Sequence, residues 1–245
     1  MFPLSIIRVG VAFVVVAICL GLIEQSVTVL GGSRLQADFA STVGVVTLLM
    51  IWPWVGPALT ERLIDPSKLQ VDEAKQAEVS QMLSRMLPAG VKPPKVVLFK
   101  DEAPKGISLG TKHGSIMALS TGLSASMSES QMRAVVAHEL GHILAGHTIQ
   151  SFWLLGTLFF SKALFGGFGL FVALFLLVIF LFLLRSNEYE ADRRAAVLVG
   201  RESMSDALVR LKATTRSNAV SESRWLTWLS THPAFSQRIE RLKGS

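Results

Sequence analysis

Two histidines and a glutamate lie within five consecutive residues, His138-Glu139-Leu140-Gly141-His142. On a helix, residues four apart share a face, so both imidazoles can reach one metal ion. Glu139 lies about 100° further round the helix than His138, where its carboxylate can hold a water molecule beside the ion without binding the ion itself. The pattern predicts zinc-dependent hydrolysis, with His138 and His142 as ligands and Glu139 as general base.

A catalytic zinc usually takes three protein ligands and keeps a fourth position open. One candidate for the third is His147, but the extended pattern H-E-x-x-H-x-x-G-x-x-H needs glycine at position 145 and histidine at position 148. This chain has Ala145 and Thr148 there. We therefore interpret His147 as a residue at the membrane interface.

The other candidate is Glu188, which shares one face of a predicted helix with Ala191 and Ala195. These small alanines let another helix approach closely, so Glu188 is predicted to face the partner helix. Asp192 follows one turn later and can accept the second ring N–H of a ligating histidine. Glu190 falls on a different side and is predicted to be exposed to solvent.

The helix that carries the histidines is predicted to begin near Ser128, because Ser128 and Gln131 form a capping-box signature. A second helix is predicted over residues 68–87. Short apolar runs at 95–100, 107–109 and 116–119 are typical of strands and predict a small sheet.

Three stretches that are nearly free of charge predict membrane helices, at residues 4–23, 40–59 and 149–184. The first has no A-x-A-like cleavage site after it, so we interpret it as an uncleaved anchor and not as a secretory signal. The sequence Gly166-Gly167-Phe168-Gly169 divides the third stretch into two arms. If His138, His142 and Glu188 bind one ion, the segments before and after this stretch lie on the same side of the membrane. The stretch must then cross the membrane an even number of times, as a spanning or re-entrant hairpin.

The chain carries a net charge of +6 without a basic run, which argues against nucleic acid as a partner. Arg34 is the only Lys or Arg between residues 24 and 39, whereas the soluble segments on either side of the hairpin are rich in both. The positive-inside rule therefore places the soluble segments and both termini in the cytoplasm. Cys19 is the only cysteine, which excludes an internal disulfide or a cysteine-based metal site.

With these residues in place, the chain resembles the HtpX family of membrane metallopeptidases, relatives of the CAAX prenyl proteases. The resemblance covers most of the chain from about residue 70 and rests on the following segments: the H-E-x-x-H helix and its hydrophobic hairpin, Glu188-Tyr189-x-Ala191-Asp192, Gly200-Arg201-Glu202-x-Met204, Ala207-Leu208-x-Arg210-Leu211-Lys212, Thr231-His232-Pro233, and Arg238-Ile239 with Leu242.

The resemblance implies a zinc-dependent endopeptidase of the bacterial inner membrane, with one Zn²⁺ per chain, that acts in stress response and membrane-protein quality control. It implies that Glu188 is a zinc ligand, that Asp192 supports a ligand histidine, and that His232 and Arg238 line the catalytic site. Expected partners are polypeptide substrates, membrane proteins among them, and the lipid bilayer.

One segment departs from the family pattern, which has an Asn-Ala-aromatic sequence in the edge strand that holds the substrate backbone. Residues 105–110 stand in that place here, and we expect Gly106, Ile107, Ser108 and Leu109 to bind substrate. Backbone pairing with an extended peptide needs no particular side chain. Three alternatives stay open: a CAAX-type prenyl protease, a non-enzymatic membrane adaptor, and an export component that merely contains the motif.

The expected fold is a mainly α membrane protein with a small, zincin-like α+β metalloprotease domain in the cytoplasm and about four membrane helices. Residues 1–60 would form two transmembrane helices, and residues 149–184 a transmembrane or re-entrant hairpin. Residues 61–148, which carry H-E-x-x-H, and residues 185–245, which carry the third ligand, would form the protease domain.

Overall fold

The computed structural model describes residues 27, 29–63, 72–165, 168–216 and 232–244. The chain divides into two compact units, one of residues 1–52 and 152–179 and the other of residues 53–151 and 180–245. The predicted membrane helix at 4–23 and the glycines at 166 and 167 lie outside the described residues.

The second unit contains a three-stranded sheet made of β1 (Lys95–Phe99), β2 (Gly106–Thr111) and β3 (Gly114–Ser120). The strand order is β1-β3-β2, with β1 parallel and β2 antiparallel to β3. The predicted small sheet is therefore confirmed. Because β3 is in the middle, β2 forms an edge of the sheet.

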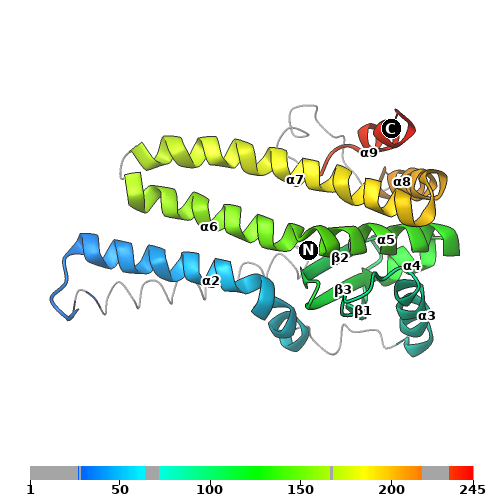
Figure 1. Cartoon of the computed structure of the whole chain (residues 1–245), viewed down its shortest axis with the longest axis horizontal. Helices are drawn as coiled ribbons and strands as arrows, with labels where there is room; N and C mark the ends of the chain where they lie inside the picture. Colours follow the sequence, from blue (N-terminus) through cyan, green and yellow to red (C-terminus); the bar gives the residue numbers. More distant parts are fainter. Residues whose placement is uncertain (1–26, 28, 64–71, 166–167, 217–231, 245) are drawn as a thin grey trace. The chain divides into compact units, whose positions relative to one another are not determined.

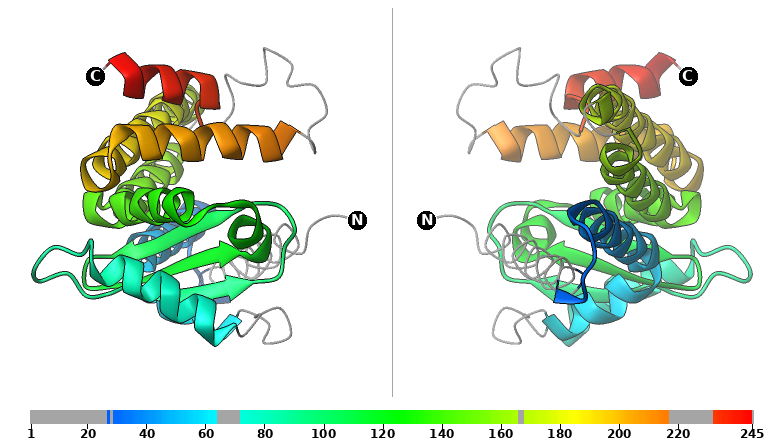
Figure 2. Two further views of the ribbon diagram at one scale, coloured as in Figure 1. Left: turned by 90° about the vertical axis from the view of Figure 1, so that its right-hand side faces the viewer. Right: turned by 90° about the vertical axis from the view of Figure 1, so that its left-hand side faces the viewer.

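The helix α5 (Glu129–Ala145) is buried along most of its length and lies between β2 and α8 (Arg201–Arg216), as Figure 2 shows. Its start is fixed as the sequence predicts: Gln131 N–H donates to Ser128 Oγ at 3.3 Å, and Ser128 N–H donates to Gln131 Oε1 at 3.1 Å. Both bonds satisfy N–H groups that have no partner within the helix.

Three further helices belong to this unit: α3 (Glu73–Ser84), α4 (Thr121–Ser126) and α9 (Phe235–Gly244). α3 contacts α5 and β1, α4 contacts β3, and α9 contacts α8. Their apolar side chains meet in one core, which α5 supplies more than any other element. Fully buried members of this core include Val79, Leu83, Met117, Leu119, Met132, Val136, Leu140, Met204 and Leu208.

The other unit contains most of α2 (Arg34–Leu63) and α6 (His147–Phe165), together with the first part of α7 (Gly169–Val199). The apolar stretch 149–184 thus forms the helices α6 and α7, which run in opposite directions (Figure 1). The side chains of Phe171, Phe175, Val178 and Phe182 on α7 are each about two-thirds exposed or more. A face of this kind suits a lipid environment better than water.

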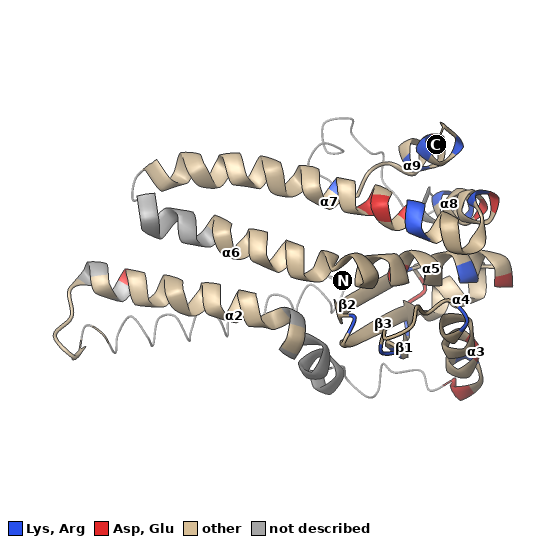
Figure 3. Cartoon of the chain, in the orientation of Figure 1, with Lys and Arg blue, Asp and Glu red and all other residues tan. Residues whose placement is uncertain are grey.

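Among the described residues, α7 is the one helix long and apolar enough to cross a membrane. Its first half carries no Lys, Arg, Asp or Glu, as Figure 3 shows, and its first charged residue is Arg185. Within α2, Asp38–Trp52 forms a shorter apolar segment. The mainly helical fold with a small sheet is confirmed, whereas the number of four membrane helices stays a prediction.

Candidate metal centre

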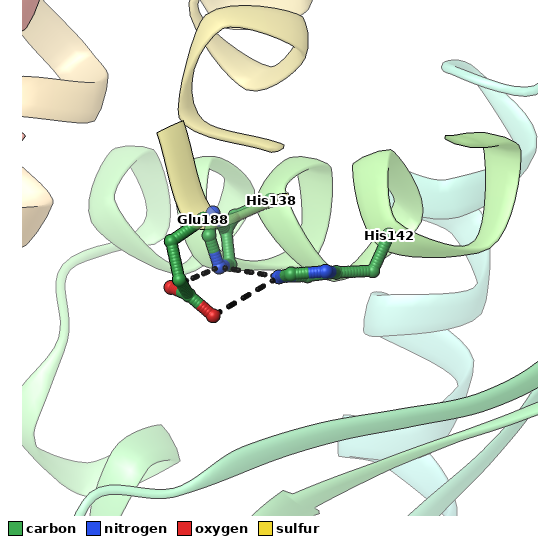
Figure 4. A group of neighbouring side chains, drawn as sticks. All are labelled: His138, His142 and Glu188. Carbon is green, nitrogen blue, oxygen red and sulfur yellow. Dashed lines mark hydrogen bonds and ion pairs between the residues drawn. The ribbon is translucent and has the colours of Figure 1, made fainter. Parts of the chain in front are cut away.

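The side chains of His138 and His142 on α5 converge with that of Glu188 on α7 (Figure 4). The two Nε2 atoms lie 3.1 Å apart. Glu188 places Oε2 at 3.6 Å from His138 Nε2 and Oε1 at 3.5 Å from His142 Nε2. The three residues, of which Glu188 follows His138 by 50 positions, thus place three donor atoms within 4.8 Å of one another.

The spacing of these atoms fits a small tetrahedral cation. Zinc–nitrogen and zinc–oxygen bonds of about 2.0–2.1 Å in a tetrahedron place neighbouring donors about 3.3 Å apart, close to the separations seen here. Two imidazoles and one carboxylate are also a common donor set of catalytic zinc. Burial, followed by the charge of His138, lowers the pKa of His142 to about 3. Its ring is therefore neutral near pH 7, which is the form that binds metals.

A glycine brings the two helices close enough to share the site. A Cβ on Gly141 would lie 3.1 Å from the backbone oxygen of Ala191, which is tighter than nearly all real contacts of this kind. Ala191 is itself fully buried. Small residues on both helices thus let α7 approach α5, and Glu188 lies one turn before Ala191 on the face that meets the histidines.

Glu139 is buried beside the histidines and faces the edge strand β2. A Cβ on Gly106 would lie only 2.8 Å from Glu139 Oε1, so only glycine leaves this carboxylate its present position. Burial raises the pKa of Glu139, whereas the charge of His138 and a hydrogen bond from the Ser108 side chain act in the opposite direction. A carboxylate with a raised pKa accepts a proton more readily at neutral pH.

Asp192 connects the cluster to α9. His138 Nδ1 lies 3.0 Å from Asp192 Oδ1, a distance at which its ring N–H donates to the carboxylate. Arg238 donates to both oxygens of Asp192, from Nε at 2.7 Å and from Nη2 at 2.6 Å. A third atom of the same guanidinium, Nη1, lies 2.9 Å from Glu188 Oε2. Arg238 therefore binds two carboxylates of the site at once, which is the fork geometry that arginine favours.

His232 reaches the same glutamate from the segment before α9. Its Nδ1 lies 2.8 Å from Glu188 Oε1, and its side chain is 68% exposed. The hydrogen bond to Glu188 raises the pKa of His232. The predicted substrate-binding residues Gly106–Leu109 lie on β2 and are not among the three residues of the metal-binding cluster.

His147 and Glu190 lie next to the cluster but are not among its three converging donors. The ring of His147 is 6% exposed and its Nδ1 lies 2.8 Å from His142 Nδ1. Glu190 is one-third exposed, lies near His147 and is bound by Arg194. Gly146, in the left-handed conformation at φ 71°, ends α5 and reorients the next residue. A glycine directly after a predicted helix was the signal that could have revealed this.

Comparisons with known proteins identify the family of this chain. The family model of peptidase family M48 matches residues 73–245. The protease HtpX of Acinetobacter baumannii (strain AYE) is 26% identical, over 82% of this chain and 81% of that protein. The protease HtpX homolog of Neisseria meningitidis serogroup C is also 26% identical, over 87% of this chain and 89% of that protein.

The crystal structure of S. mikatae Ste24p has a similar fold, with a TM-score of 0.63 at 18% sequence identity. The match covers 97% of this chain and 64% of that chain, so this protein spans less than two thirds of the length of its structural relative. The resemblance drawn from the sequence is confirmed. The chain belongs to peptidase family M48 and is a metalloendopeptidase.

Proposed function

We propose that this chain is a membrane-integrated zinc endopeptidase that hydrolyses peptide bonds of misfolded or damaged membrane proteins. The observation that carries the proposal is the convergence of His138, His142 and Glu188 beside a buried glutamate and an edge strand. These three residues would hold one Zn²⁺. When bound, zinc would activate a water molecule and polarise the scissile carbonyl.

The surrounding residues then have distinct roles. Glu139 accepts the proton of the attacking water and passes it to the leaving amine, which its raised pKa favours. His232, whose ring is exposed and lies beside Glu188, would help to stabilise the developing oxyanion. Arg238 binds the carboxylates of Asp192 and Glu188 and holds them in position. It would therefore act on the reaction indirectly, by orienting these two residues.

The edge strand β2 would bind the substrate backbone. An extended peptide can add to an exposed strand edge through main-chain hydrogen bonds. The side chain of Ile107 is 56% exposed on this strand, and Gly106 lies against Glu139. A peptide paired with β2 therefore passes the general base, which supports the assignment of Gly106–Leu109 to substrate binding.

Replacing Gly106 by alanine tests this arrangement. The new Cβ would displace the Glu139 carboxylate, because it would lie 2.8 Å from Oε1. Since a shift of about 1 Å at a catalytic group can lower a rate about a hundredfold, we expect kcat to fall roughly ten- to hundredfold while zinc content is unchanged. Gly114→Ala is the matched control, because a Cβ there meets nothing within 4 Å. Equal kcat values for the two variants would refute the assignment.

The position of α7 supports a substrate in or near the bilayer. Glu188 follows Arg185, the first charged residue after the apolar half of the helix, by three residues, which is about 4.5 Å along the axis. The proposed site therefore lies close to the end of a membrane-spanning segment. Residues 1–60 and 149–184 would supply about four membrane helices, and residues 61–148 and 185–245 the protease domain on the cytoplasmic face of a bacterial inner membrane.

A cleavage assay with two substrates tests the proposed function. The full chain, purified in detergent with zinc, is incubated with an unfolded membrane protein and separately with a prenylated peptide. We expect cleavage of the unfolded protein that a zinc chelator abolishes and that added zinc restores. Cleavage of the prenylated peptide alone would favour a prenyl protease, and no cleavage of either substrate would favour a non-enzymatic adaptor.

A further inference from the structure

His147 lies beside a proposed metal ligand although sequence spacing alone would not place it there. Five residues on an uninterrupted helix correspond to a rotation of about 140° beyond one full turn, which would direct His147 away from His142. Gly146 ends α5 in a left-handed conformation, and α6 begins at His147. The Gly146 N–H donates back to the carbonyls of His142 and Ile143, which fixes the break. The break directs the His147 ring to His142, at 2.8 Å between the two Nδ1 atoms.

Metal binding through Nε2 of His142 would fix the hydrogen positions on both rings. His142 directs Nε2 toward His138 and Glu188, so its lone pair is needed there and its proton must reside on Nδ1. The Nδ1–H of His142 then donates to Nδ1 of His147. As a result the single ring N–H proton of a neutral His147 lies on Nε2.

A carboxylate lies near that second nitrogen. Glu190 Oε2 is 3.5 Å from His147 Nε2, an electrostatic contact longer than an ordinary hydrogen bond. The same carboxylate accepts from Arg194 at 2.7 and 3.0 Å, which holds it in place. Negative charge at this point favours the tautomer of His147 that has its proton on Nε2 and its acceptor toward His142.

We infer that His147 is a positioning residue that orients the His142 ring for metal binding. Asp192 contacts Nδ1 of His138, and His147 contacts Nδ1 of His142 in the same way. Each proposed ligand ring thus has one partner on the side that faces away from the cluster. The inference rests on the proposed ligand set. Partners of this kind set the ring orientation and raise the basicity of the ligand, and their loss typically weakens metal binding about 10- to 100-fold.

Two amide substitutions separate this role from simple packing. In His147→Asn the amide lies near the place of Nδ1 and can still accept from His142. In His147→Gln the amide lies near the place of Nε2 and leaves a methylene group toward His142. Both side chains are polar and uncharged, so a role in packing alone predicts no large difference between them.

The experiment measures zinc affinity by competition with a chromophoric chelator on the full chain in detergent. All proteins carry Glu139→Gln, which limits self-cleavage. We expect His147→Gln to bind zinc about 10- to 100-fold more weakly than the parent protein, and His147→Asn to remain within a few-fold of it. The absorption bands of bound Co²⁺ should shift in the glutamine variant and less in the asparagine variant. His113→Leu, at an exposed histidine outside the cluster, is the control.

Equal zinc affinities and equal cobalt spectra of the two amide variants would overturn the inference. A parent protein that binds no zinc would instead overturn the proposed ligand set itself, so the two failures are distinguishable. Circular dichroism of the zinc-free proteins verifies that each variant is folded before its affinity is compared.

Discussion

Replacing Glu139 by glutamine is expected to lower peptide cleavage by roughly two to four orders of magnitude, which is the usual contribution of a general base. Glutamine keeps the size of the side chain and its position beside β2, but it cannot accept the proton of the attacking water. Zinc content and thermal stability should be unchanged, because Glu139 is not one of the three converging donors. The measurement is the initial cleavage rate of purified protein, with bound zinc determined on the same samples.

Glu129→Gln is the matched control, since Glu129 is exposed in the first turn of the same helix. It removes one carboxylate from α5 without touching the site, and its rate should equal that of the unmodified chain. If Glu139→Gln cleaves as fast as this control, Glu139 is not the base.

Replacing Arg238 by methionine is expected to lower the free energy of unfolding by about 3–5 kcal/mol, the usual effect of removing one partner from a buried ion pair. Arg238 is 7% exposed and donates to both oxygens of Asp192 while lying 2.9 Å from Glu188. Methionine fills part of the volume but leaves two buried carboxylates without their counter-charge. The unfolding experiment is done on zinc-free protein, because a bound cation would compensate part of the lost charge.

Arg241→Met is the control on the same helix. Arg241 is exposed and lies over the ring of Tyr189, 4.4 Å from its centroid, a contact worth about 0.5–1 kcal/mol at such a site. Equal destabilisation by the two substitutions would show that Arg238 does not hold the carboxylates of the site.

The sequence predicts most of the site because local rules determine it. The capping box places the start of α5, the four-residue spacing puts both histidines on one face, and the small residues around Glu188 identify the face that meets α5. The sequence does not predict how close α5 and α7 lie to each other. In the structure the close contact between Gly141 and Ala191 sets that distance.

What the sequence could not predict depends on contacts between distant segments or on single backbone angles. The parallel pairing of β1 with β3 makes β2 an edge and brings Gly106 to Glu139, and no local pattern encodes that pairing. Arg238 could be an ordinary surface charge until α9 is placed against α7. The contact of His147 with His142 was not predicted because one left-handed glycine, Gly146, changes the direction of the chain between them.

The central claim is that one cation is held jointly by α5 and α7, and metal analysis of three proteins tests it most directly. Zinc is measured per chain by mass spectrometry after dialysis against a weak chelator, for the unmodified chain, for Glu188→Ala and for Glu202→Ala, a control at an exposed residue of α8. We expect about one zinc per chain in the first and third and little in Glu188→Ala, because two histidines alone bind zinc weakly. Full zinc content in Glu188→Ala would contradict the account.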